Sequence, residues 1–363
     1  MNLRELSKGL SKLRKLSILI SVFCLNLGLV ETLSAQATFQ FTIQSWATYT
    51  TYDRYEFNAD SSALVLDETS TQLGAGIRRA RLRGKMTKGK VDAFIQYDAL
   101  SSYVVDAQID YNFNENFKMR LGRFVGAGSQ AGGNTSHTAI DFAERSMVGR
   151  LWASAVSRSD YRTYGMAVIG KFNNFDYQIL AQNGDGLLNL RPYGTSSSHS
   201  DEDTGVIPQF DFAVSTVIGD AINVGLHYGL PNEKRVNVSS ATGFLYFRPK
   251  DYSKGKFRGK FDFAQVVNHE NDQDATSLGW GVGGFYRLSS KMELGAGFQQ
   301  WDPNTDTEKD AFGNILIGAT YSPDPDHWKD TLFKLVATFK TSEIENEPLD
   351  PLVIHLVWQA YMH

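Results

Sequence analysis

Short segments in which apolar and polar residues alternate recur along almost the whole chain. In the segment 104–113 every second residue is apolar, namely Val105, Ala107, Ile109, Tyr111 and Phe113. The residues between them are polar, namely Asp106, Gln108, Asp110 and Asn112. Successive side chains of a strand point to opposite faces, so such a segment forms a strand with one apolar and one polar face. The pattern therefore predicts strands rather than helices.

The alternation predicts about sixteen strands. Their expected ranges are 38–52, 72–88, 90–101, 103–113, 117–125, 161–172, 175–183, 208–218, 221–230, 242–250, 256–267, 278–288, 291–301, 312–321, 331–341 and 352–361. This leaves about 20 residues for each strand and its connection, which suits membrane-crossing strands of about 10 residues.

The connections alternate between short and long. The short ones are 87–90, 114–116, 173–174, 219–220, 251–255, 289–290 and the less short 322–330. The long ones are 53–71, 126–160, 184–207, 231–241, 268–277, 302–311 and 342–351, with 101–102 as the exception. Bacterial transmembrane barrels have short periplasmic turns and long external loops. We therefore expect an all-β fold, a transmembrane antiparallel β-barrel, with a soluble β-sandwich as the alternative.

The first 37 residues have the layout of a secretory signal peptide. Five basic residues precede the apolar run 16–30, and Ala35-Gln36-Ala37 forms a cleavage site. We expect the barrel to comprise 38–363 and to lie in the outer membrane of a Gram-negative bacterium. A retained membrane anchor is the alternative, although the apolar run is short for a spanning helix.

Composition narrows the possible functions. The only cysteine, Cys24, lies in the apolar run of the signal, so we expect no disulfide or thiolate chemistry after it. Without residues 1–37 the net charge is −7, which argues against nucleic acid as a partner. No stretch of 18 apolar residues follows residue 37, so the sequence predicts no inner-membrane helix.

The second predicted strand carries a row of basic residues. Its alternate positions are Arg79, Arg81, Arg83 and Lys85, opposite in parity to Ala80, Leu82, Gly84 and Met86. A cation on the lipid face costs about 2–4 kcal/mol at the membrane midplane, so we expect these four to line the lumen. The fifth strand adds Lys118, Arg120 and Arg123 as further pore-lining candidates, and Arg258 and Lys260 alternate in the same way.

Two interpretations of these cations stay open. Rows of Arg and Lys select anions, and a planar guanidinium binds phosphate or carboxylate through paired hydrogen bonds. Alternatively, the cations pair with acidic residues on neighbouring strands and only stabilise the wall. The candidate acidic partners are Asp92, Asp98, Asp106 and Asp110.

The longest connection, 126–160, is a candidate constriction. It begins with small residues and becomes apolar and charged over 140–145. Loops of this length usually have a function, and in a barrel of this size folding into the lumen would narrow it. The charged candidates at the constriction are Asp141, Glu144, Arg145 and Arg150, together with Arg158. An external flap is the alternative.

Four stretches of the sequence resemble the phosphate-selective porins O and P. They are Arg78-Arg79-Ala80-Arg81-Leu82-Arg83-Gly84, Asp106-Ala107-Gln108-Ile109-Asp110-Tyr111, Lys118-Met119-Arg120-Leu121-Gly122-Arg123-Phe124 and Asp141-Phe142-Ala143-Glu144-Arg145-Ser146. The resemblance is specific over about 72–150 and implies a sixteen-stranded, usually trimeric porin with an inward-folded third loop. It also implies that Arg79, Arg81 and Arg83 belong to an arginine ladder.

Together these observations predict a passive, water-filled channel for small hydrophilic solutes, with a preference for anions such as phosphate. The expected partners are these solutes, outer-membrane lipid and further copies of the chain in a homotrimer. We expect no cofactor, no metal and no enzymatic activity, because the histidines form no catalytic set with serine or acids that we can place. The alternatives are a non-conducting structural or adhesive barrel and, less favoured, a barrel enzyme.

Two further motifs are set aside. The glycines of 279–284 resemble a nucleotide-binding loop, but no helix pattern follows, and glycines in a strand instead make room for neighbours. The acidic loop 302–308 has the spacing of calcium ligands but lacks the required glycine, so an ordered calcium site there stays only as the alternative.

Overall fold

The computed structural model describes residues 36–57, 64–156, 161–182, 209–231, 238–249, 255–268, 275–343 and 352–362. The predicted signal peptide lies almost entirely outside these ranges, so its removal stays a prediction. Within them, no helix is both long enough and apolar enough to cross a membrane.

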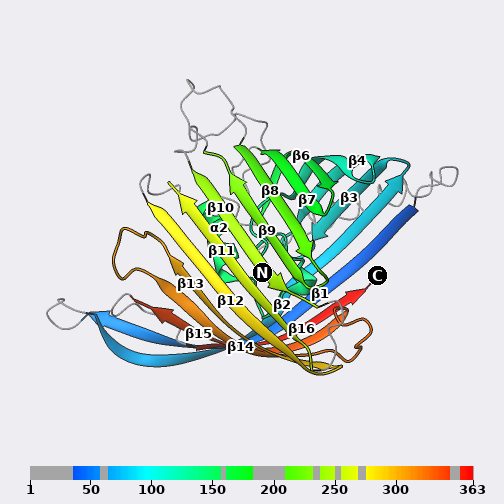
Figure 1. The fold of residues 1–363 in the computed structure, drawn as a ribbon. Coiled ribbons are helices and arrows are strands. Elements are labelled where there is room, and N and C mark those ends of the chain that lie inside the picture. Colours follow the sequence, from blue (N-terminus) through cyan, green and yellow to red (C-terminus); the bar gives the residue numbers. More distant parts are fainter. Residues whose placement is uncertain are drawn as a thin grey trace, which may run out of the picture.

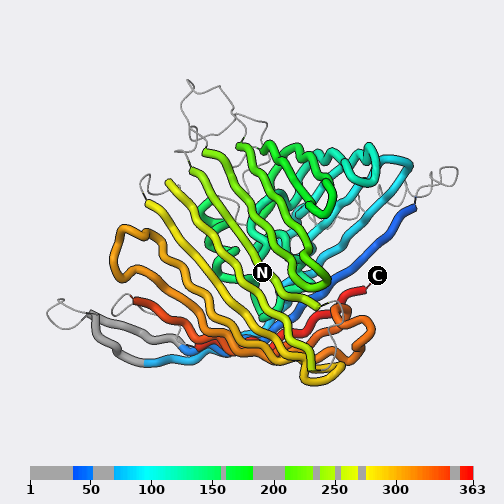
Figure 2. Tube along the Cα trace, in the orientation of Figure 1, coloured from blue at the N-terminus to red at the C-terminus, as the bar shows by residue number. Residues whose placement is uncertain are grey.

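The described residues form a closed barrel of sixteen antiparallel strands, as the alternation predicts. Each strand pairs with its neighbours along the chain, and β1 pairs with β16 to close the barrel (Figures 1 and 2). The strands are β1 Gln36–Phe57, β2 Leu64–Lys88, β3 Val91–Asp98, β4 Tyr103–Asn114, β5 Phe117–Val125, β6 Arg162–Phe172, β7 Phe175–Gln182, β8 Gln209–Ile218, β9 Ile222–Gly229, β10 Ser239–Phe247, β11 Phe257–Val267, β12 Thr276–Ser289, β13 Met292–Asp302, β14 Phe312–Tyr321, β15 Thr331–Ser342 and β16 Leu352–Met362.

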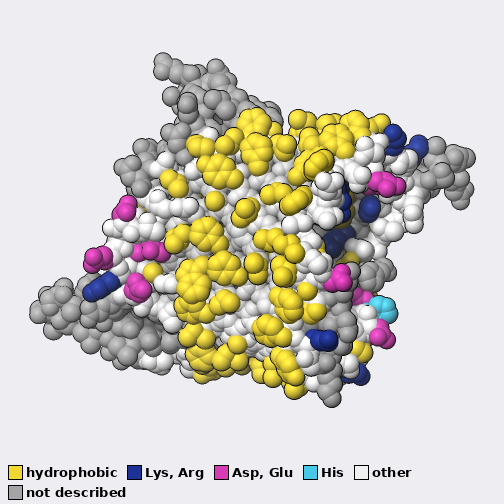
Figure 3. Space-filling view, viewed as in Figure 1, with side chains coloured by type: hydrophobic (Ala, Val, Ile, Leu, Met, Phe, Trp, Pro, Cys, Tyr) yellow, Lys and Arg dark blue, Asp and Glu magenta, His cyan; other side chains and the backbone are white. Residues whose placement is uncertain are grey.

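The two faces of the wall follow the alternation. On β16, Leu356 and Trp358 are 53% and 52% exposed on the outside, whereas Val357 and Gln359, which alternate with them, are fully buried on the inside. Hydrophobic side chains cover the middle of the outer face in Figure 3, and charged side chains lie toward its edges. This apolar outer surface makes the molecule a transmembrane barrel of the outer-membrane type.

The first hairpin is longer than the sequence predicts. Residues 53–71 are expected to be an external connection, but β1 continues to Phe57 and β2 begins at Leu64. The two strands stay paired over this whole extension. The expected connection was wrong because its polar composition masks the alternation.

Two β-bulges also change the predicted faces. The register of β1 with β2 shifts at Arg78, and the register of β3 with β4 shifts at Val105. An extra residue in one strand breaks the alternation locally. Val105 is therefore fully buried beside Asp106, and not on the lipid face with Ala107 as the strict alternation predicts.

The long connection after β5 folds into the barrel, as predicted. We call its described part, 126–156, the constriction loop; it contains a short helical turn η1, His137–Ala139, and the helix α2, Met147–Ala155. The buried residues Val148 and Trp152 of α2 pack with Ala264 and Val266 of β11 and Trp301 of β13. Figure 1 shows α2 behind β10 and β11, on the inner side of the wall.

Glycines on the inner wall make room for this loop. A Cβ built on Gly297 of β13 would lie 3.2 Å from the ring of Phe142, and one on Gly281 of β12 would lie 3.7 Å from Val148. Phe142 in turn packs with Phe285, and the pair belongs to a buried cluster that includes Leu316. The glycine run of the sequence thus marks the wall on which the constriction loop rests.

Candidate functional site

The arginines of the basic row on β2 point to the inner side of the wall, but they differ in their partners. Arg81 forms an ion pair with Asp98 at 3.0 Å. Arg79 donates to the amide oxygen of Gln44 at 2.5 Å, and Arg83 donates to the amide oxygen of Gln96 at 2.5 Å. Only the middle arginine of the three is thus neutralised by a carboxylate among the described residues.

The bulge adds a residue that the sequence analysis missed. By strict alternation Arg78 would share the outer face with Ala80, but its guanidinium forms an ion pair with Glu144 of the constriction loop at 2.9 Å. It also donates to the carbonyl of Ala143 and lies 4.6 Å from the ring centre of Trp46. The sequence did contain a sign of this bulge. Arg78 and Arg79 are adjacent, and in a regular strand one of two adjacent arginines would have to face the lipid.

Around β4 and β5, most basic side chains form ion pairs with acidic ones, which is the second of the two interpretations of the cations. Asp110 accepts from Lys118 at 2.9 Å and from Arg120 at 2.7 and 2.8 Å. Asp106 accepts two hydrogen bonds from Arg162 of β6, at 2.8 and 3.0 Å, and Arg162 was also missed. The Asp110 contacts join the neighbouring strands β4 and β5, and the Asp106–Arg162 pair joins β4 to β6 across β5, so each acid here is paired with at least one cation.

The remaining wall candidates have other environments. Asp92 accepts from Thr87 and Asn112 and has no cationic partner among the described residues. Arg123 is buried and donates to the carbonyls of Val104 and Val105. Lys85 is exposed near the start of the β2–β3 turn.

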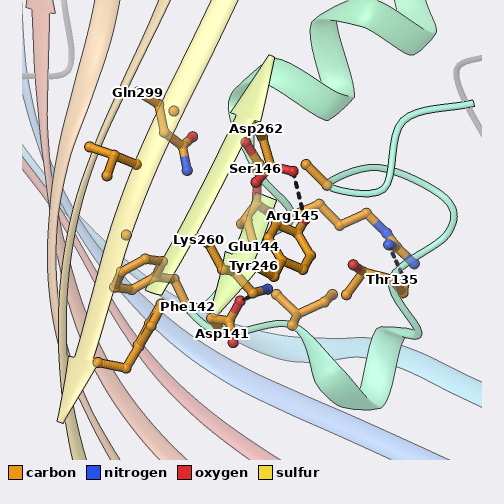
Figure 4. Close-up of a pocket in the computed structure, with 16 residues that line it drawn as sticks. Thr135, Asp141, Phe142, Glu144, Arg145, Ser146, Tyr246, Lys260, Asp262 and Gln299 are labelled. Carbon is orange, nitrogen blue, oxygen red and sulfur yellow. Dashed lines mark hydrogen bonds and ion pairs between the residues drawn. The ribbon is translucent and has the colours of Figure 1, made fainter. Parts of the chain in front are cut away.

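The predicted constriction residues take part in two separate networks. Glu144 lies between Arg78 and Arg150, at 2.9 Å from each, and so ties the loop to β2. Asp141 binds Arg258 at 2.6 Å and also Lys260, both on β11, and so ties the loop to the opposite wall. Figure 4 shows Lys260 and Asp141 directed toward each other. Arg158 lies outside the described residues.

Arg145 is directed into its own loop. It donates to the carbonyl of Thr135, beside which Figure 4 shows it, and to that of Gly132. Its guanidinium lies 5.1 Å from the ring centre of Tyr161. Like Arg79 and Arg83, it has no carboxylate within ion-pair distance among the described residues.

His137 of the constriction loop lies near several of these arginine side chains. Burial, followed by the nearby guanidiniums of Arg83, Arg81, Arg79 and Arg145, holds the pKa of His137 well below its usual range. The imidazole is therefore neutral, and its Nδ1 accepts a hydrogen bond from Arg83 at 2.8 Å. The junction of β2 with the constriction loop thus holds four guanidiniums around one neutral ring.

At Asp141, in contrast to His137, burial and the neighbouring charges act on the pKa in opposite directions. Burial alone would raise the pKa of its carboxyl, but Lys260 and Arg258 hold that pKa well below the usual range. Lys334 of β15 donates to the carbonyls of Ile140 and Phe142 on either side of it. Glu293 completes the network by accepting two hydrogen bonds from Arg258, at 2.6 and 3.1 Å.

Comparison with known proteins gives a fold. No family model matches the sequence, and no curated protein matches it. The outer-membrane channel DcaP of Acinetobacter baumannii is 13% identical with a TM-score of 0.62, over 90% of this chain and 97% of that one. An anion-selective porin from Comamonas acidovorans is 13% identical with a TM-score of 0.57, over 91% and 100%.

A third similar structure is the trimer form of OmpT, an outer-membrane protein of Vibrio cholerae. It is 12% identical with a TM-score of 0.54, over 90% of this chain and 99% of that one. The likeness extends over nearly the full length of all three barrels, although the identities are low. The chain therefore has the porin type of sixteen-stranded β-barrel.

Proposed function

We propose that this protein is a passive outer-membrane channel for small hydrophilic solutes that prefers anions. The observation that carries the proposal is the junction of β2 with the constriction loop, where Arg79 and Arg83 have neutral partners. A guanidinium whose partners are amide oxygens or a neutral imidazole is not neutralised by them, so its positive charge can attract an anion in the lumen. The proposal involves no chemical step, and the absence of enzymatic activity stays a prediction.

The solutes we propose are phosphate and other small anions. Arginine presents paired donors that match the oxygens of phosphate and carboxylate, which supports this class. The sequence resemblance to phosphate-selective porins points in the same direction. One of the proteins with a similar fold is described as anion-selective, which is a statement about that protein.

The structure also supports the proposed homotrimer. β2 pairs with β3 only over Arg81–Lys88, so the stretch 64–79 has no strand beside it on that edge among the described residues. β3 itself has eight residues, fewer than the roughly 9–11 that a membrane-crossing strand needs. Unpaired strand edges are not exposed to the hydrocarbon of a membrane. The short β3 and the unpaired edge of β2, which we call the low wall, therefore require another protein surface as a cover. We propose that a neighbouring copy of the chain supplies it.

Solute release from liposomes tests the channel. Proteoliposomes are loaded with inorganic phosphate and with a neutral sugar, and the release of both is followed after insertion of the folded protein. We expect both to be released, with phosphate faster, and we expect Arg79→Gln/Arg83→Gln to slow phosphate but not sugar. If neither solute is released, the protein is a non-conducting barrel.

A further inference from the structure

The connection between β14 and β15 is unusually long for a periplasmic turn. It spans nine residues, 322–330, whereas two residues join β6 to β7. Its shape is set internally, because the Asp324 carboxylate accepts from the backbone N–H groups of Asp326 at 3.1 Å and His327 at 3.3 Å. The hydroxyl of Ser322 donates to the Asp324 carbonyl at 2.7 Å. These hydrogen bonds within the turn give it a defined conformation.

One buried amide connects this turn to the constriction loop. The Nε2 of Gln359, on the inner face of β16, donates to the carbonyl of Lys329 at 2.8 Å and to that of Thr138 at 3.3 Å. Gln359 is fully buried. The turn and the loop are therefore held at a fixed separation.

A chamber of about 210 Å³ lies between them. Its basic lining residues are Arg248, Arg258, Arg287, Lys329 and Lys334, and its acidic ones are Asp141 and Glu293. The lining thus has a formal excess of three positive charges. The volume is several times the roughly 30 Å³ of one water molecule, so a small ion fits with part of its hydration shell.

The negative charges are already engaged. Asp141 and Glu293 each bind Arg258 at 2.6 Å, on one side of the chamber. Arg248 and Lys329 have no carboxylate within ion-pair distance in the described parts of the chain. Their charges are therefore available to a ligand in the chamber.

An aromatic ring orients a third cation. The ring of Trp328, from the long turn, lies 3.7 Å from the guanidinium carbon of Arg287. Stacking of this kind fixes the plane of the guanidinium, and Nη1 of Arg287 also donates to the carbonyl of Ser290 at 3.3 Å. The turn thus contributes both Trp328 and Lys329 to the chamber.

We propose that this chamber is a binding site for one small oxyanion, either phosphate or a carboxylate, on the periplasmic side of the constriction loop. The site goes beyond channel function, because it is built by different residues from those at the β2 junction. Arg248 supplies paired donors, Arg287 supplies a positive charge held against Trp328, Lys329 supplies an ammonium, and the long turn closes the chamber on one side.

Calorimetric titration of the full folded chain in detergent tests the site, with inorganic phosphate and succinate as separate probes. We expect saturable binding of at least one anion, and its identity distinguishes a phosphate site from a carboxylate site. Arg248→Gln/Lys329→Gln should weaken this binding at least about tenfold, equivalent to about 1.4 kcal/mol. Trp328→Ala should also weaken it by freeing Arg287.

The matched control is Lys256→Gln/Lys291→Gln, which removes two exposed periplasmic charges that do not line the chamber. Binding should be unchanged in this control. The proposal is overturned if folded protein binds neither anion, or if the control weakens binding as much as the chamber variant. Loss of binding in Arg79→Gln/Arg83→Gln, with the chamber variant unaffected, would also overturn it. The assay measures binding and does not require conduction, so its result tests the proposed site independently of the proposed channel function.

Discussion

Single residues determine how firmly the constriction loop is held. Asp141 is largely buried and, among the described residues, is the acid whose ion pairs tie the loop to β11. Removal of one member of a buried ion pair costs about 3–5 kcal/mol, because the partner charge is left uncompensated. In Asp141→Asn, Lys260 and Arg258 lose this partner. We expect the loop to leave the wall, and single-channel recordings to show higher conductance with more flicker.

The control for this prediction is Glu115→Gln. Glu115 is an exposed acid in the short turn between β4 and β5, outside the constriction loop and the chamber. Its replacement should leave conductance as in the wild type. Equal conductance of Asp141→Asn and the wild type would show that the ion pairs do not hold the loop.

The same carboxylate gives a prediction for pH. The folded-state pKa of Asp141 is depressed. The stabilisation it provides is therefore complete above the unfolded pKa of about 3.9 and is lost only as the pH falls through the lower, folded-state value. We expect the conductance difference between the wild type and Asp141→Asn to be the same at pH 5 and pH 8. A difference that disappears between these values would contradict the account.

At the scale of elements, the glycine-lined inner wall positions the loop. In Gly297→Val, the new side chain enters the space of the Phe142 ring, which lies 3.2 Å from a Cβ at this position. Overpacking of this kind typically costs about 1–3 kcal/mol. We expect higher conductance and a lower melting temperature by circular dichroism. Gly74→Ala is the matched control, because nothing lies within 4 Å of its Cβ.

The elements also show what the sequence could and could not predict. Strict alternation located all sixteen strands and the inward face of Arg79, Arg81 and Arg83, because the lipid face excludes charge over the whole length of a strand. It failed at Arg78 and Val105, because a bulge is one inserted residue that leaves no mark in composition. The ion pairs of Arg162 with Asp106 and of Asp141 with Arg258 join residues distant in the chain. Such pairs depend on strand register, which a single sequence does not provide.

At the scale of the whole molecule, the low wall at β2 and β3 should face another copy of the chain. Leu73 is 79% exposed on the outer face of β2, beside the unpaired edge. We expect Leu73→Arg to convert trimers to monomers in native mass spectrometry, because a charge is placed in the proposed interface. Val214→Arg, on the outer face of β8, should cost a similar amount in lipid but leave the trimer intact. Trimers that persist in Leu73→Arg would place the interface elsewhere.

Charge in the lumen is the central claim, and the reversal potential in a KCl gradient measures it most directly. The wild type should be anion-selective, and Arg79→Gln/Arg83→Gln should lose that preference. The matched variant Arg81→Gln/Asp98→Asn removes an ion pair without changing the net charge, so it should keep the wild-type reversal potential. A cation-selective wild type, or equal reversal potentials for the wild type and Arg79→Gln/Arg83→Gln, would contradict the account.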